Sequence, residues 1–180
     1  MAVCEFIEVE VSGRRVYVAL HPVTVEEFCT FMDASGRPRP PRLRCGRSGS
    51  SPVVEVAQED AAAYCRWLCR QEGRACRLPS IAELQTLMED AQADDLDFGV
   101  WPTEAGRMPA LRGGLKPVCL CEWTCETLEV PRSDGRHARA LASIFYPPWL
   151  REGNNVMHVH ASVSASEGYS FVTFRVACDG

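Results

Sequence analysis

The segment from Pro52 to Met88 constrains the fold most, because local chemistry marks the ends of two helices within it. In the first helix, apolar side chains recur at the i, i+3, i+4 and i+7 spacing of a half-buried helix, at Ala61, Tyr64, Cys65 and Leu68. Glu59 and Asp60 place negative charge in its first turn, and Gly73 can adopt the left-handed backbone that ends a helix.

The second helix of this segment is expected to begin at Ser80. The Ser80 hydroxyl can accept from the amide of Glu83, whose carboxylate can reach back, and Pro79 keeps the helix from starting earlier. One apolar stripe then follows, made of Ile81, Leu84, Leu87, Met88 and Ala91.

A hairpin and a third helix are predicted before this segment. The β-rich runs at residues 6–11 and 15–20 are joined by Ser12-Gly13, which is typical of a tight turn. A helix should begin at Thr24, where Glu27 completes a capping box, and end at Gly36. Its buried stripe is expected to be Val25, Phe28, Cys29 and Met32.

The composition fits one compact domain over residues 1–180. The 180 residues are 46% hydrophobic, yet no apolar run approaches the roughly 20 residues that cross a bilayer. The net charge of −5 argues against a nucleic-acid partner, since phosphate binding needs a basic face. We therefore expect a cytoplasmic protein with no membrane and no nucleic-acid contact, while its oligomeric state stays open.

The only strongly basic stretch is a loop of arginines interleaved with prolines and glycine, with arginines at positions 37, 39, 42, 44 and 47. Prolines at this density favour an extended backbone over a helix. A solvated loop is one interpretation, and a site for an acidic partner is the other.

The ten cysteines are scattered along the chain and form no paired C-x-x-C motif. We therefore expect reduced, mostly buried thiols, and a fold that does not depend on disulfides. A thiolate metal site built from Cys119, Cys121 and Cys125 is the alternative, although residues that alternate along a strand point to opposite faces.

The helical segment resembles the motif of the formylglycine-generating enzyme, or sulfatase-modifying factor, family, a bacterial-type domain. The matching positions are Pro52, Val53, Val56, Asp60, Ala61, Tyr64, Cys65, Trp67, Leu68, Arg77, Leu78, Pro79, Ser80 and Glu83. Further likeness lies in HPVT from His21, CEWT from Cys121 and FRVA from Phe174. The resemblance implies an α+β, C-type-lectin-like fold with much irregular structure, in which residues 52–56 form a strand.

The resemblance also implies where catalysis would occur, and the sequence departs from the family there. Catalytic members hold copper(I) through two cysteines after an R-G-G-S-W motif, but this chain has residues 139–144 in place of the motif and no cysteine from Phe145 to Phe171. Sulfoxide synthases of the family use a histidine triad, for which His158 and His160 would supply at most two ligands. We assign no catalytic and no metal residue.

Calcium is a further cofactor that the resemblance brings into view. The family's G-N-V-W-E-W-T binds calcium, but Cys119 stands here in place of the asparagine, so an oxygen ligand is lost. The acidic cluster of Asp94, Asp95 and Asp97 forms no calcium-binding loop pattern. We therefore expect no cofactor.

The C-terminal segment has the composition of a recognition surface, with aromatic and amide side chains set among small residues. The candidate ligand-binding residues are Phe145, Tyr146, Trp149, Asn154, Asn155, His158, His160 and Tyr169, with Phe171 beside them. About half of the aromatic side chains are expected to fill the core. The same segment varies in the similar variable proteins of diversity-generating retroelements.

The sequence therefore favours a non-catalytic recognition module that binds a protein, peptide or small ligand through a C-terminal groove. The alternative is a metal-dependent oxidase or sulfoxide-synthase-like enzyme. Aromatic side chains with adaptable polar neighbours favour the first interpretation.

Overall fold

The computed structural model describes residues 5–39, 49–89, 120–131, 138–147 and 160–180, and these form an α+β fold. Two four-stranded sheets have the orders β1-β2-β8-β3 and β6-β5-β4-β7. The first contains β1 (Phe6–Val11), β2 (Arg14–Ala19), β3 (Cys76–Arg77) and β8 (Ala177–Asp179). The second contains β4 (Cys121–Pro131), β5 (Ala138–Phe145), β6 (His160–Ser164) and β7 (Val172–Thr173).

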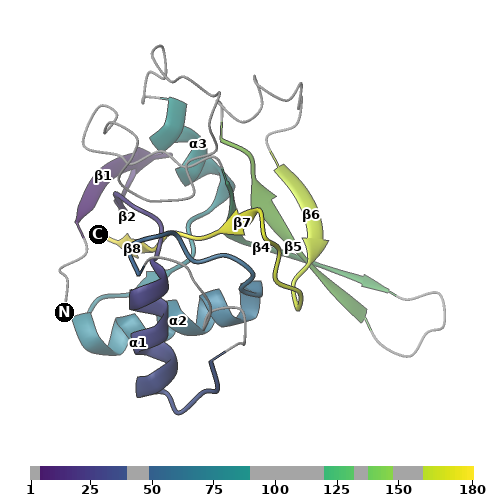
Figure 1. The fold of residues 1–180 in the computed structure, drawn as a ribbon. Coiled ribbons are helices and arrows are strands. Elements are labelled where there is room, and N and C mark those ends of the chain that lie inside the picture. Colours follow the sequence, from purple (N-terminus) through teal and green to yellow (C-terminus); the bar gives the residue numbers. More distant parts are fainter. Residues whose placement is uncertain (1–4, 40–48, 90–119, 132–137, 148–159) are drawn as a thin grey trace, which may run out of the picture.

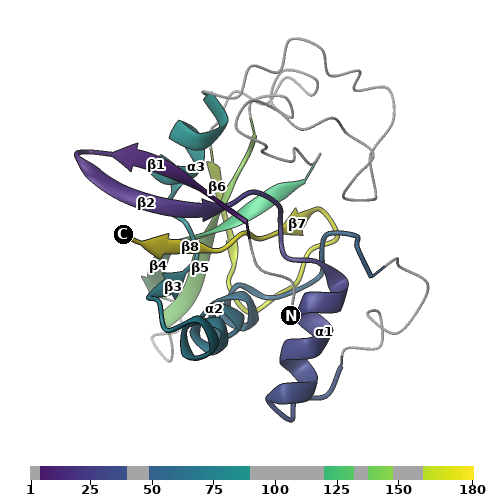
Figure 2. The same ribbon diagram turned by 90° about the vertical axis from the view of Figure 1, so that its left-hand side faces the viewer.

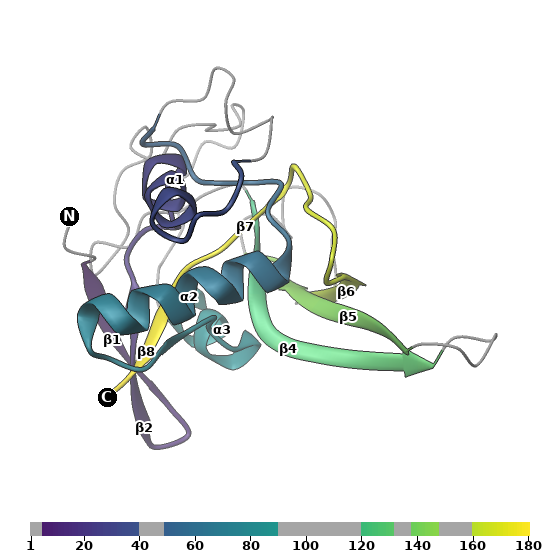
Figure 3. The same cartoon turned by 90° about the horizontal axis from the view of Figure 1, so that it is seen from below.

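Within the described residues, three helices accompany the sheets: α1 (Val25–Ala34), α2 (Gln58–Glu72) and α3 (Ile81–Glu89). Figure 1 shows α1 and α2 side by side below the sheets, while α3 lies near the β1–β2 hairpin. The hairpin projects to one side in Figure 2, and β4 and β5 form a long antiparallel ribbon that is clearest in Figure 3. Among the helices of the described residues, none is long and apolar enough to cross a membrane.

The predicted hairpin is confirmed. Strands β1 and β2 pair from Phe6↔Ala19 to Val11↔Arg14, so two residues make the turn. Ser12 and Gly13 both have positive φ, at 53° and 77°, which matches the twist of a two-residue hairpin.

Helix α1 begins as predicted, but its buried face is wider than the stripe expected from sequence. The Thr24 side chain accepts from the Glu27 amide, and the Glu27 carboxylate accepts from the Thr24 amide. Cys29 is only half-buried, whereas Phe31 is buried. Phe31 packs against Tyr64 and Trp67 of α2, so a long-range contact adds a residue that helical spacing alone did not select.

Helix α2 agrees with its prediction at its C-terminal end and along its buried face. Ala61, Tyr64, Cys65 and Leu68 are all buried. Gly73 has φ of 67°, and its amide donates to the Cys69 carbonyl, which closes the last turn.

The prediction of a strand at residues 52–56 is wrong. Only Pro52 forms a bridge, to Thr24, and Glu55 has a positive φ of 62° that turns the backbone away from an extended path. The run is apolar because Val53, Val54 and Val56 fill the core, which a sequence pattern does not distinguish from a buried strand.

Helix α3 has the predicted capping box, and an ion-pair network surrounds it. The Glu83 carboxylate accepts from the Ser80 amide at 2.8 Å, and the Glu83 amide donates to the Ser80 hydroxyl at 3.2 Å. Arg77 donates to both Glu83 oxygens and to Asp179 of β8. Arg77 therefore links the start of α3 to strand β8.

A buried ion pair links the two sheets. Glu122 of β4 and Arg175 are both fully buried, and the Arg175 Nε lies 2.9 and 3.0 Å from the two Glu122 oxygens. Arg175 also donates through Nη1 to the carbonyls of Ala19 and Leu20 at the end of β2. An arginine partner for Glu122 follows from the cost of burying an unpaired carboxylate. Burial raises the pKa of Glu122, and the Arg175 guanidinium opposes that rise.

Glu122→Gln should lower the free energy of unfolding by about 3–5 kcal/mol, because it leaves the Arg175 charge buried without its partner. Arg175→Met should have a similar cost, and the double variant should lose much less than the sum of the two single changes. Urea unfolding of all four proteins measures this. Losses that add fully would show that the two side chains do not act as a pair.

Glu83→Gln should remove an acid-sensitive part of the stability. Burial alone would raise the pKa of Glu83, but the Arg77 guanidinium and the Ser80 amide hold the pKa below its ordinary value. A carboxylate with a lowered pKa in the folded state stabilises the protein above its unfolded pKa, and this contribution is lost as pH falls. The difference between wild type and Glu83→Gln should therefore be largest near neutral pH and shrink below about pH 4.5, close to the ordinary pKa.

Urea unfolding between pH 3 and pH 7 follows this difference. Ser80→Ala is the control, because it removes about 1 kcal/mol of capping without removing a charge, so its cost should depend much less on pH. A Glu83→Gln difference that stays constant across the range would contradict the assignment of the Arg77 network.

Candidate functional site

An aromatic surface lies where β4 begins, β5 ends and β7 starts. Strand β7 runs parallel to β4, with Cys121 opposite Val172, and β5 is antiparallel, with Glu122 opposite Phe145. The next residues, Phe171 before β7 and Tyr146 after β5, therefore lie on either side of the start of β4. Residues from three separate parts of the sequence therefore meet at this end of the second sheet, where β4 and β7 start and β5 ends.

Three rings form a row from the core to the surface, each tilted against the next. Trp123 is fully buried and donates through its indole nitrogen to the Val56 carbonyl at 2.8 Å. The Tyr169 ring lies 6.0 Å from Trp123 and 5.5 Å from Phe171, which is 42% exposed. The Ser164 amide donates to the Tyr169 hydroxyl, which in turn donates to Glu167, so Tyr169 is held at both its ring and its hydroxyl. We call Tyr169 and Phe171 the aromatic pair.

Main-chain hydrogen bonds hold the backbone under the aromatic pair. The Glu55 amide donates to the Tyr169 carbonyl, the Gln58 amide to the Ala165 carbonyl and the Cys121 amide to the Phe171 carbonyl. Gly168 lies against this support, since a Cβ atom there would come within 2.2 Å of the Glu55 carbonyl oxygen. The loop therefore has a fixed path that depends little on its side chains.

The structure places four of the predicted ligand-binding residues. Phe145 has no exposed surface and packs in a cluster with Leu84, Met88 and Val18, so a ligand cannot reach it. Tyr146 and Tyr169 are half-buried, and His160, opposite Phe145 in the β5–β6 ladder, is exposed. Burial raises the pKa of the Tyr146 hydroxyl. The other four, Trp149, Asn154, Asn155 and His158, lie outside the described residues.

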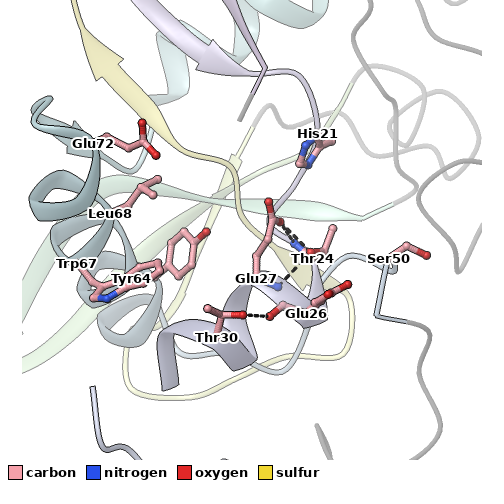
Figure 4. A pocket seen from close by; sticks show the side chains of 10 residues that line it. All are labelled: His21, Thr24, Glu26, Glu27, Thr30, Ser50, Tyr64, Trp67, Leu68 and Glu72. Carbon is pink, nitrogen blue, oxygen red and sulfur yellow. Dashed lines mark hydrogen bonds between the residues drawn. The ribbon is translucent and has the colours of Figure 1, made fainter. Parts of the chain in front are cut away.

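A second feature, which sequence patterns did not reveal, is a cavity of about 530 Å³ between α1, α2 and the connection from β2 (Figure 4). Its described lining residues are His21, Thr24, Glu26, Glu27, Thr30, Ser50, Tyr64, Trp67, Leu68 and Glu72. Tyr64, Trp67 and Leu68 face it from α2, and Glu27 faces it from α1. Their aromatic and acidic types were visible in sequence, but only the packing of α1 against α2 brings them together.

The described lining of this cavity is acidic, and we call the cavity acidic on that basis. Three carboxylates line it, at Glu26, Glu27 and Glu72, and no lysine or arginine does so among the described residues. Glu27 Oε2 is used by the capping box of α1, with the Thr24 amide and hydroxyl both at 2.8 Å. Glu72 ends α2, where the helix dipole disfavours a carboxylate, so helix stability does not explain this residue.

The described residues provide no metal centre. No group of three or more histidine, cysteine, aspartate or glutamate side chains within them could hold a metal ion. Cys121 is buried, with its pKa raised to about 12 by burial and by Glu122, whereas Cys125 is exposed. Cys119, His158 and the Asp94, Asp95 and Asp97 cluster lie outside the described residues, so the predictions made on them stay predictions.

The described part of the arginine loop is paired with carboxylates. Arg37 bonds to Asp60 at 2.6 Å and lies over the Phe31 ring, and Arg39 bonds to Asp33. The Arg39 guanidinium beside Asp33 also lowers the pKa of that carboxyl. These two arginines are thus engaged within the chain, while residues 40–48 lie outside the described part.

Comparisons with known proteins agree with this fold. Residues 8–95 match the model of the sulfatase-modifying factor enzyme 1-like domain. PvdO from Pseudomonas aeruginosa has a similar structure, with a TM-score of 0.69 and 16% identity over 93% of this chain and 82% of PvdO. No curated protein sequence matches the chain.

Two further solved structures are similar. Variable protein 1 of Treponema denticola has a TM-score of 0.67 and 13% identity, covering 92% of this chain and 85% of that protein. CarF has a TM-score of 0.67 and 12% identity, covering 98% of this chain and 97% of CarF. At these identities the likeness establishes the fold alone.

The protein thus has an α+β fold of the formylglycine-generating-enzyme, C-type-lectin-like type. The resemblance seen in the sequence is confirmed, because the sulfatase-modifying factor domain model matches residues 8–95 and the structural neighbours share the fold over more than nine tenths of the chain. This fold is compatible with enzymes and with recognition modules, so the function has to be inferred from the chemistry of the site.

Proposed function

We propose that this chain is a non-catalytic recognition module that binds a protein, peptide or small ligand at the surface around the aromatic pair. The observation that carries the proposal is the exposure of Phe171, 42%, at the outer end of a row of rings that begins at buried Trp123. Half-buried Tyr146, which follows β5 beside the start of β4, extends the surface. We further propose that the protein works in the cytoplasm, without nucleic-acid or membrane partners.

The physical basis is preorganisation. A ring already fixed by its neighbours loses little side-chain entropy on binding, so more of its contact energy is retained. Tyr169 is fixed by Trp123, Ser164 and Glu167, and the backbone carbonyl of Phe171 is fixed by the Cys121 amide. Aromatic anchors of this kind dominate binding energy in protein interfaces.

The non-catalytic part of the proposal rests on the sequence. Copper(I) needs soft sulfur ligands, and the segment from Phe145 to Phe171 contains no cysteine. The alternative function is a metal-dependent oxidase or sulfoxide-synthase-like enzyme. It would require ligands from residues outside the described part of the chain, such as His158.

Phe171→Ala should weaken ligand binding at least about tenfold, because truncation of a central aromatic anchor commonly costs more than 1 kcal/mol. Ligands would be found by NMR titration of the full chain with a peptide library and a panel of small aromatic and carbohydrate compounds. Leu128→Ala is the matched control, since Leu128 is also an exposed apolar residue, at 58%, but lies on β4 away from the aromatic pair. It should leave the affinity unchanged.

Two results would contradict the proposal. Equal affinity in wild type and Phe171→Ala would place the binding surface elsewhere. Oxygen consumption with a thiol substrate, dependent on stoichiometric copper or iron, would favour the oxidative enzyme. Binding that survives a chelator is the outcome expected of the recognition module.

The acidic cavity between α1 and α2 supports a second binding site, for a cationic group such as an amine or guanidinium. An aromatic face attracts a cation, and the cavity is lined by half-buried Trp67 together with three carboxylates. An aliphatic chain could pack on Leu68 while its charged end meets the acidic rim. The unfavourable position of Glu72 at the C-terminal end of α2 supports a role in binding over one in stability.

Glu72→Gln should weaken binding of n-butylamine or arginine methyl ester, measured by NMR titration, while leaving the stability unchanged or slightly higher. Glu59→Gln is the matched control, because Glu59 is an exposed acid on the same helix that does not line the cavity. Binding should also weaken as salt is raised, and n-butanol should not bind. Equal losses in both variants would show that only the general charge of the protein matters.

A further inference from the structure

Two buried thiols face each other across the first sheet. Cys76 of β3 and Cys178 of β8 are directly opposite in an antiparallel register, and their Sγ atoms lie 3.0 Å apart. The two residues are 7% and 1% exposed. They are 102 positions apart in sequence, so no local pattern could have paired them.

The backbone geometry at this pair suits a disulfide. The Asp179 amide donates to the Ala75 carbonyl, so the neighbouring pair, Cys76 and Cys178, occupies a non-hydrogen-bonded position of the ladder. At such positions the Cα atoms are about 4.5 Å apart and the side chains are close, which lies within the range that disulfides span. The sulfurs need to approach by about 1 Å to reach the bonded distance of about 2.05 Å.

We propose that Cys76 and Cys178 are a redox-active pair that forms one reversible disulfide, stapling the C-terminal strand β8 to β3. In this reaction both S–H bonds break, one S–S bond forms, and two protons and two electrons pass to an oxidant. The oxidant is a small-molecule disulfide, which is reduced to two thiols, or a hydroperoxide, which is reduced to an alcohol and water.

The staple would act on a weakly held part of the sheet. Strand β3 has only two residues and joins β8 through two paired positions. The next residue, Arg77, carries the ion pairs to Glu83 and Asp179, so the disulfide would reinforce the link between the start of α3 and β8. A crosslink between residues so far apart in sequence restricts the unfolded chain strongly.

The surroundings of the pair make its oxidation slow. Burial raises the pKa of both thiols, so little of the reactive thiolate exists at neutral pH. Cys69 at the end of α2 is half-buried and accepts from the Cys76 amide at 2.7 Å, which makes it the competing partner for Cys76. The test must therefore identify which thiols are joined.

The experiment treats the full chain with diamide, an azo compound that takes up two electrons and two protons, and compares it with chain kept in dithiothreitol. Free thiols are alkylated under denaturing conditions, and peptide mapping locates the linkage. We expect a peptide pair that joins Cys76 to Cys178, and a melting temperature about 5–15 °C higher than in the reduced protein, as one disulfide gives in a chain of this size. Dithiothreitol should reverse both changes.

Variants separate this pair from the other thiols. Cys178→Ser should lose both the linked peptide and the rise in melting temperature, whereas Cys65→Ser and Cys69→Ser should keep both. Cys65 is the matched control, because it is a buried thiol on α2 that lies near Cys178 but outside the facing pair. If Cys178→Ser does not fold, the peptide map of the oxidised wild type decides the question alone.

Three outcomes would overturn the proposal. One is a linkage of Cys76 to Cys69, and another is full alkylation of both thiols after prolonged diamide treatment. The third is a Cys76–Cys178 linkage that leaves the melting temperature unchanged, because the bond would then form without stapling the strand.

Discussion

The buried pair of Glu122 and Arg175 is the constraint on which the rest of the structure depends. Two charges without solvent contact must satisfy each other, and here they also bind the carbonyls of Ala19 and Leu20. The pair therefore fixes the end of β2, the start of β4 and the chain between β7 and β8 at one point. Alternative arrangements of the two sheets would leave a charge unpaired in the core, so the pair favours one arrangement strongly.

Both candidate binding surfaces rest on the core that this pair organises. Trp123, next to Glu122, supports the aromatic pair, and Tyr64 packs edge to face on Phe174, next to Arg175, while it lines the acidic cavity. Exposed Phe171 is thus the outer member of a ring cluster whose inner member, Trp123, is buried, and Tyr64 belongs to the core itself. Rigidity at the surface comes from the same packing that stabilises the fold.

Much of the local structure could be predicted from the sequence, because caps and turns depend on a few neighbouring residues. Thr24, Ser80 and Gly73 took the predicted roles. Predictions failed where contacts between distant parts of the chain determine the structure. Residues 52–56 are apolar without being a strand, and Phe145 is a core residue. The acidic cavity was not foreseen, since it exists only where α1 meets α2.

The loop from Ala165 to Phe171 has a consequence for how this protein can evolve. Its path is set by main-chain hydrogen bonds to Glu55, Gln58 and Cys121. Outward-facing side chains on such a backbone can be exchanged at little cost to the fold, whereas Gly168 is constrained by the close approach of the Glu55 carbonyl and Ala165 by its burial in the core. A scaffold of this kind separates the residues that meet a partner from those that maintain the shape, so new specificities can arise without new architectures.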